Sequence, residues 1–135
     1  MAGKIIADTL EHSTAGSVDT QFVVNGSAKC WISYNTVTTV STYDSLNVST
    51  LTDLGGVGGA VTVTATNAFQ NINYAVGAET GLVTTGPCMM NIHANAAWTT
   101  LAPTTTRFAL LTSTHDASAL KDTEFASAEV KGDLA

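Results

Sequence analysis

The sequence predicts an all-β fold: an antiparallel, Greek-key-like sandwich lobe preceded by a short N-terminal arm. In several segments small or apolar residues alternate with polar ones at a period of two, which is the pattern of half-buried strands. About eight short strands follow one another at spacings of roughly 10–14 residues, as in a β-sandwich. The 135 residues suit one domain, and the chain holds no internal repeat and no proline-rich linker.

Residues 1–20 differ in composition from the rest of the chain, and we interpret residues 1–24 as an arm that precedes a lobe at residues 25–135. Acidic residues and a break of small residues interrupt the apolar positions of the arm. Ile5, Ile6 and Leu10 would form one face of a short helix, or part of an extended segment that packs only against a partner. The arm is therefore expected to lack a core of its own.

From Gln21 onward the residue pattern predicts strands. Between Ala28 and Ser33, small or apolar residues alternate with Lys29 and Trp31, as expected of one buried and one outward face. The glycine-rich segment 55–59 is interpreted as a hairpin connection between the strands on either side of it. The segments with strand patterns are residues 22–24, 28–33, 36–43, 46–51, 60–66, 73–78, 88–93, 107–112 and 123–130.

The charge of the chain limits its partners. The net charge is −6, the pI is about 4.6, and the five Lys and Arg residues are scattered. Nucleic-acid binding and attraction to anionic membranes both depend on clustered cations, so neither is predicted. No apolar stretch approaches the ~20 residues that span a bilayer, so no membrane insertion is predicted. The first residues also lack the pattern of a secretion signal, which predicts synthesis in a cytoplasm.

Charged residues are unusually scarce. They make up 12% of the chain, against about 25% in typical soluble domains. Few charges are then left to coat the surface, and Thr takes much of their place. We therefore expect part of the surface to be buried against other chains.

No cofactor and no metal site are predicted. His12, His93 and His115 are far apart in the sequence, whereas a zinc site needs three or four converging ligands. One His from each of three copies, meeting on a threefold axis, remains an alternative. Cys30 and Cys88 form no CxxC pair, so we expect two reduced, buried thiols; a disulfide between them stays open.

No enzymatic activity is predicted. The chain has no Gly-x-Ser-x-Gly element, and its abundant Ser and Thr make chance combinations with His and Asp uninformative. Asp44, Asp53 and Glu79 each follow or precede turn-forming residues, where solvated acids are expected. Residues 55–59 lead into a strand with no Lys nearby, so they do not match a phosphate-binding loop.

Aromatic residues are the candidates for contacts with sugars or with other chains. They include Trp31, Tyr34, Tyr43, Tyr74 and Trp98. Aromatic side chains more often pack in a core or at a subunit interface than bind a ligand. For Trp31, which lies between Cys30 and an isoleucine, packing is favoured; for Trp98, exposure and partner contact are weighted equally.

Several blocks of the sequence resemble a family of short bacteriophage tail-fibre and fibre-tip proteins. These blocks are, in order, IADT at 6–9, VDTQFVVNGSAKCW at 18–31, YN at 34–35, DSLNVSTLTD at 44–53, the glycine turn at 55–59, NY at 73–74 and GDLA at 132–135. The resemblance covers nearly the whole chain. It departs at Cys30, where a small residue such as Ala is usual, and at Thr42-Tyr43, where the family usually has Arg before the acid. Residues 77–106 match least.

The resemblance implies a homotrimeric, non-enzymatic virion protein on the phage tail or capsid surface, made in the bacterial cytoplasm. Residues 1–24 would dock on other virion proteins, and the lobe would bind a host-surface glycan or protein. Residues expected to pack in the core or at the trimer interface are Phe22, Trp31 and Tyr34, with Trp31 near the interface. Residues expected to contact the receptor, in or near loops 79–87 and 95–106, are Thr85, Asn95 and Trp98. The alternatives are a head fibre or capsid decoration (cement) protein, and a carbohydrate-binding module.

Overall fold

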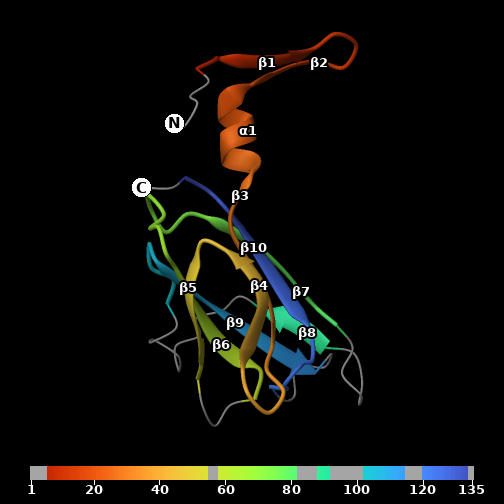
Figure 1. The fold of residues 1–135 in the computed structure, drawn as a ribbon, viewed down its shortest axis with the longest axis vertical. Helices are drawn as coiled ribbons and strands as arrows, with labels where there is room; N and C mark the ends of the chain where they lie inside the picture. Colours follow the sequence, from red (N-terminus) through yellow and green to blue (C-terminus); the bar gives the residue numbers. More distant parts are fainter. Residues whose placement is uncertain (1–5, 55–57, 82–87, 92–101, 115–119, 134–135) are drawn as a thin grey trace.

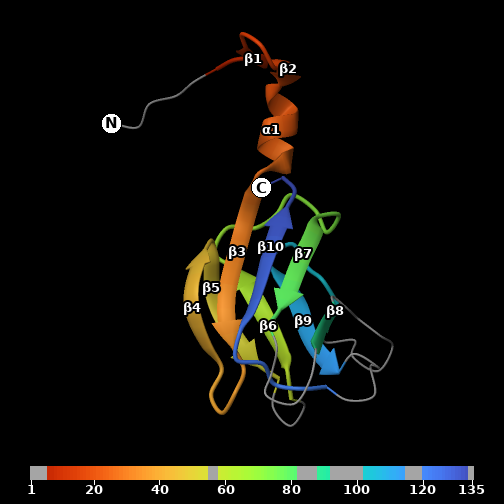
Figure 2. The ribbon, with the colours of Figure 1, turned by 90° about the vertical axis from the view of Figure 1, so that its right-hand side faces the viewer.

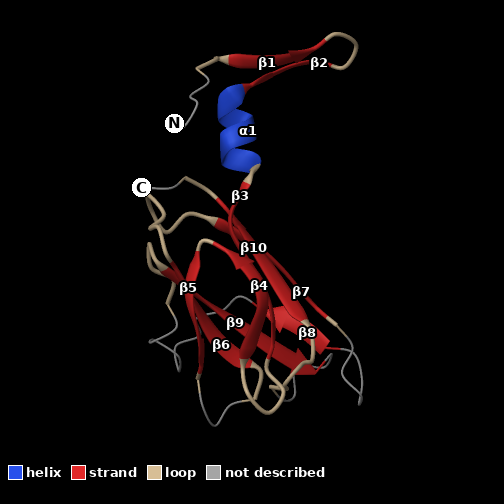
Figure 3. Cartoon of the chain, in the orientation of Figure 1, coloured by secondary structure: helices blue, strands red, loops and turns tan. Residues whose placement is uncertain are grey.

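In the computed structural model, residues 6–54, 58–81, 88–91, 102–114 and 120–133 are described. They form a lobe of two stacked antiparallel sheets, and an arm projects from one end of the lobe (Figures 1 and 2). The arrangement confirms the prediction of an all-β sandwich preceded by an N-terminal arm. Figure 3 shows one short helix, in the arm, among the elements of the described part of the chain.

Both sheets of the lobe have four strands, and every pair of neighbouring strands is antiparallel. The first sheet has the order β4 (Ser41–Leu46), β3 (Ala28–Asn35), β10 (Ala126–Lys131) and β7 (Ala75–Thr80). The second has the order β5 (Val48–Asp53), β6 (Ala60–Ala65), β9 (Arg107–Thr114) and β8 (Cys88–Asn91). The C-terminal strand β10 is thus inserted between β3 and β7, two strands that precede it in the chain.

The core lies between the two sheets and follows the period of two in the sequence. In β3, Cys30, Ile32 and Tyr34 are buried, whereas the residues between them are only partly buried. In β10, Ala126, Ala128 and Val130 are buried in the same way. The other members of the core cluster are Val61, Val63, Ala65, Phe69, Phe108 and Leu110. Burial of these apolar side chains is the main contribution to the stability of the lobe.

The chain passes from the first sheet to the second at a single residue, Asn47, which lies between β4 and β5. Its φ of 57° is in the left-handed region, which Asn tolerates better than most residues. The Asn47 side chain donates a hydrogen bond to the Lys29 carbonyl at 3.0 Å and accepts one from the Asn67 backbone N–H at 2.8 Å. This corner divides residues 46–51, which the sequence predicted to be one strand, between two sheets.

The prediction of a strand at residues 36–43 is wrong for the first half of that segment. β4 begins at Ser41, and Thr38 has a φ of 62°, which no continuous strand accommodates. Thr36 is buried, and its hydroxyl accepts a hydrogen bond from the Thr123 backbone N–H at 2.8 Å. This bond to the segment before β10 holds the end of β3 and redirects the chain, so the β-branched run cannot continue straight.

The arm consists of a hairpin and a helix. β1 (Thr9–His12) pairs with β2 (Gly16–Asp19), and α1 (Thr20–Gly26) follows directly. The strand predicted at residues 22–24 is therefore wrong. A strand needs a neighbour to bond its backbone groups, whereas a helix bonds its own. The arm projects beyond both sheets of the lobe (Figure 2), and β2 is already paired with β1, so residues 22–24 have no strand to pair with.

Gly59 stands at a position that no other residue can occupy without strain. Its φ is +71°, and a Cβ there would lie 2.1 Å from the Lys121 carbonyl oxygen and 2.9 Å from that of Thr112. Its own N–H donates to Asp122 Oδ1 at 2.7 Å. We expect Gly59→Ala to lower the free energy of unfolding by about 1–3 kcal/mol. At the neighbouring Gly58 a Cβ would meet nothing closer than 3.6 Å, so Gly58→Ala is the matched control. Urea unfolding measures both variants. An equal loss of unfolding free energy in the two would contradict the expectation.

Candidate functional site

The described residues offer two candidate surfaces, and the first is the arm. Every residue of β1 and β2 is exposed, and α1 has no buried residue. Even so, the arm is rich in apolar side chains. Six of the ten exposed large apolar residues in the described part of the chain lie in it: Ile6, Leu10, Val18, Phe22, Val23 and Val24. The arm thus presents apolar surface that its own chain leaves in solvent.

Neither element of the arm is expected to be stable on its own. An isolated two-stranded hairpin is marginal in water, and so is a helix shorter than about 12 residues. The seven-residue helix α1 begins after Asp19, whose side chain makes no capping hydrogen bond. Phe22 is 61% exposed, so its burial adds little within one chain. The arm therefore lacks, within its own chain, the packing that would hold a short helix and a hairpin together.

The joint between arm and lobe is fixed by Lys29, in β3. Its ammonium group donates hydrogen bonds to the Val24 carbonyl and to the Ser27 hydroxyl. The Ser27 N–H donates to the Val23 carbonyl at 3.0 Å, which closes the last turn of α1. A cation at a helix C-terminus satisfies free carbonyls and complements the helix dipole. The segment 23–35 therefore runs from the end of the arm into the core strand β3.

The second candidate surface is the outer face of the sheet β4-β3-β10-β7. Residues paired across neighbouring strands point to the same face of a sheet, so the register defines which side chains meet. Two rows cross this face: Leu46–Trp31–Glu129–Gly77 and Asp44–Ser33–Ser127–Glu79. An indole, three carboxylates and two hydroxyls therefore lie together on one outward surface.

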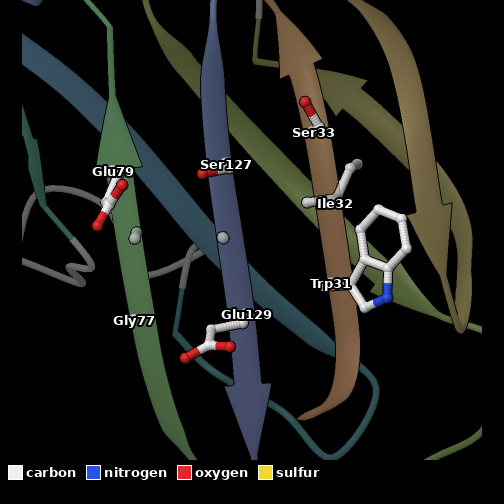
Figure 4. Close-up of a pocket in the computed structure, with 9 residues that line it drawn as sticks. Trp31, Ile32, Ser33, Gly77, Glu79, Ser127 and Glu129 are labelled. Atoms are coloured by element: carbon white, nitrogen blue, oxygen red, sulfur yellow. The ribbon is translucent and has the colours of Figure 1, made fainter.

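An open groove of about 480 Å³ follows these rows from β3 across β10 to β7. The residues that line it on the outer face are Trp31, Ser33, Gly77, Glu79, Ser127 and Glu129. Figure 4 shows the Trp31 indole beside β3 with its ring nearly face-on to the viewer, and Glu79 and Glu129 on the neighbouring strands. Lys131 pairs with Glu129 at 2.9 Å, but both side chains are about half exposed, where such a pair contributes little to stability.

Of the residues predicted to pack in the core or at a trimer interface, only Tyr34 lies in the core, where it is 0% exposed. Phe22 is exposed in α1, and Trp31 lies on the outer face of the first sheet. Phe22 and Trp31 therefore lie outside the core of the single chain, and their packing at a trimer interface stays a prediction. The same alternation that buries Cys30 turns Trp31 outward. The residues predicted to contact a receptor, Thr85, Asn95 and Trp98, lie outside the described residues.

The described residues offer no cluster of metal ligands, and the Cys30 side chain is a buried thiol. No group of three or more His, Cys, Asp or Glu residues in this part of the chain could hold a metal ion. His93 and His115 lie outside it. Cys30 is a free, buried thiol, and burial raises its pKa from 9.0 to about 11. At neutral pH the group therefore stays protonated, and a thiol is neither the nucleophile nor the metal ligand that a thiolate is.

The three acids expected beside turns all lie within strands, Asp53 as the last residue of β5. Asp44 is in β4 and Glu79 is in β7, both on the outer face of the first sheet. Glu129 and Gly77 were not among the predicted site residues. The alternation of β10, with buried Ala128 and Val130 on either side of Glu129, would have placed that carboxylate outward. No local pattern, however, indicates that Glu129 and Gly77 share a row with Trp31.

Comparison with known protein families, with characterised proteins and with solved structures finds no match for the chain. Within the described residues, no helix combines the length and hydropathy needed to cross a bilayer.

Proposed function

We propose that the chain is a structural subunit of a bacteriophage virion: a homotrimeric tail-fibre or fibre-tip protein, without enzymatic activity, that attaches by its arm and presents the β lobe to the host surface. The observation that carries the proposal is the arm. It holds most of the exposed large apolar residues and ends in a helix with no buried residue. The sequence resemblance to short fibre proteins supplies the virion context.

The apolar arm supports self-association. In a trimer, the three helices would pack together through the face of α1 that carries Phe22, and this side chain would lose its contact with water. Burying such side chains contributes about 1.5–3 kcal/mol for each one that becomes fully buried. Three short helices would then gain from association the stability that none has alone. The hairpin β1–β2, at the far end of the arm from the lobe, would remain for contact with other virion proteins (Figure 1).

Presentation of the lobe fits the same arrangement. Three lobes held at one end would display three copies of each lobe surface side by side. Several weak sites on one particle gain affinity from their high effective concentration, so each site can be shallow. The lobe needs no deep pocket for this role, and the groove on the first sheet is open.

The test is antibody labelling of the phage particles that encode the chain. Antibodies raised against the lobe are expected to label the tail, at its fibres or tip, in electron micrographs. Labelling over the capsid would replace the proposal with a head fibre or a capsid decoration protein. Particles that contain no copy of the chain by mass spectrometry would overturn the virion assignment altogether and leave a free carbohydrate-binding module as the alternative.

A further inference from the structure

From the geometry of the groove on the outer face of the sheet β4-β3-β10-β7, we infer that it binds a pyranose oligosaccharide without acidic groups, with Trp31 as the stacking surface. The inference rests on the proposed function only for the biological role of the groove, which would be recognition of the host surface. The binding itself follows from four features of the groove: the indole, the carboxylates, the glycine and the charge.

The Trp31 indole supplies an apolar surface next to polar groups. It is partly exposed, lies beside β3 and turns one ring face outward (Figure 4). Its neighbours in the register are Leu46 on one side and Glu129 on the other. An indole presents an apolar face together with a polar N–H, which suits ligands that also have an apolar face and polar groups beside it. A pyranose ring is such a ligand, because one face carries C–H groups and the rim carries hydroxyls.

The polar groups across the groove require a ligand rich in hydrogen-bond donors. Ionised Glu79 and Glu129 can only accept hydrogen bonds, whereas the hydroxyls of Ser33 and Ser127 can donate and accept. Sugar hydroxyls supply donors at several positions around one ring. Hydrogen bonds that involve a carboxylate are stronger than neutral ones, so a few such bonds can orient a ligand in an open groove.

Gly77 is the second independent observation that points to a ligand. It lies in the interior of the six-residue strand β7, where glycine weakens a strand and often marks the close approach of a ligand. Its backbone does not require glycine, since a Cβ there would only make ordinary contacts with Glu129, at 3.5 Å from Cγ and 3.6 Å from Oε1. A side chain at this position would, however, stand within the groove that Gly77 lines. The glycine therefore keeps the groove open at a cost in strand stability.

Charge argues against the other occupants of this face. Asp44, Glu79 and Glu129 all project from it, and one cation, Lys131, pairs with Glu129. The other cation of the face, Lys29, is bonded to the end of α1. A second copy meeting this face with its own would bring like charges together, which costs free energy. An acidic glycan would be disfavoured for the same reason.

The experiment is a titration of the full-length chain with neutral hexasaccharides of glucose, galactose, mannose and N-acetylglucosamine, and with a hexamer of galacturonic acid. Binding is followed by fluorescence in a Trp98→Phe background, where Trp31 is the sole tryptophan. At up to about 10 mM sugar, we expect saturable binding of at least one neutral hexasaccharide and none of the acidic one. Absence of binding by every neutral hexasaccharide, or preference for the acidic one, would overturn the inference.

Two variants locate the site. Calorimetric titration is expected to show that Gly77→Val weakens binding at least about tenfold while the melting temperature stays equal or rises, since valine favours strands. The matched control is Ala75→Val, in the same strand and on the same face but outside the groove. Trp31→Ala should weaken binding by a similar factor without loss of the native oligomer. If Gly77→Val binds as well as Ala75→Val does, or if Trp31→Ala dissociates the oligomer, the face is not a glycan site.

The outcomes separate this inference from the proposed function. Neutral-glycan binding by a chain that is absent from phage particles would retain the groove and reject the virion role. Particles labelled at the tail, combined with no binding of any neutral hexasaccharide, would retain the virion role and reject the groove.

Discussion

Replacing Tyr34 with alanine is expected to lower the free energy of unfolding of the lobe by about 3–5 kcal/mol, the range for truncation of a large aromatic residue in a core. Among the described residues, Tyr34 is the largest side chain that is fully buried, with 0% exposure. It packs in the cluster that joins β3 to the second sheet, with Phe69 and Phe108 among its members. Chemical denaturation measures the loss, with refolding as the check on reversibility.

Tyr34→Phe is the control that separates ring from hydroxyl. The Tyr34 hydroxyl is buried and has no hydrogen-bond partner among the described residues. The same burial raises the pKa of this phenol above its usual value. Removing an unpaired buried polar group removes its desolvation penalty of about 1–3 kcal/mol, so Tyr34→Phe is expected to leave stability unchanged or raise it. If Phe and Ala destabilise equally, the hydroxyl has a partner and the ring contributes less than its burial indicates.

Deleting residues 1–26 is expected to convert a trimer into a monomer while the lobe keeps its melting temperature. Light scattering after size exclusion should give about three times the 13.9 kDa chain mass for the full chain. The truncated chain should give the mass of a single lobe. The reason is that the core cluster contains no residue of the arm, whereas the arm holds apolar residues that its own chain leaves exposed. A truncated lobe that remains trimeric would place the interface on the sandwich instead.

A single substitution makes the same comparison without truncation. Phe22→Ser removes the largest exposed apolar side chain of α1, and Ile72→Ser removes one of similar exposure in the lobe, at 61% and 55% respectively. We expect Phe22→Ser to raise the protein concentration below which the trimer dissociates. Ile72→Ser should leave this concentration unchanged. Equal effects of the two variants would mean that α1 is not the specific contact.

The local patterns of the sequence were sufficient for the fold class and for the faces of the core strands. A period of two defines which side of a strand is apolar whatever its partners are. Cys30, Ile32 and Tyr34 are buried, and the glycine-rich segment joins the antiparallel pair β5–β6, as predicted. The outward direction of Trp31 follows from the same alternation. What the alternation leaves open is whether an outward residue meets solvent or another element.

The tertiary structure alone decided which distant residues share a surface. It also decided which short segments adopt the secondary structure that their residue types favour. The groove exists because β10 enters between β3 and β7, which brings Trp31, Glu129 and Gly77 into one row from three separate parts of the chain. Such pairing depends on the whole sheet, so no local pattern records it. The same holds for residues 22–24: their aromatic and β-branched character favours a strand, but a strand needs a neighbour, and no strand of the lobe or of the β1–β2 hairpin pairs with this segment.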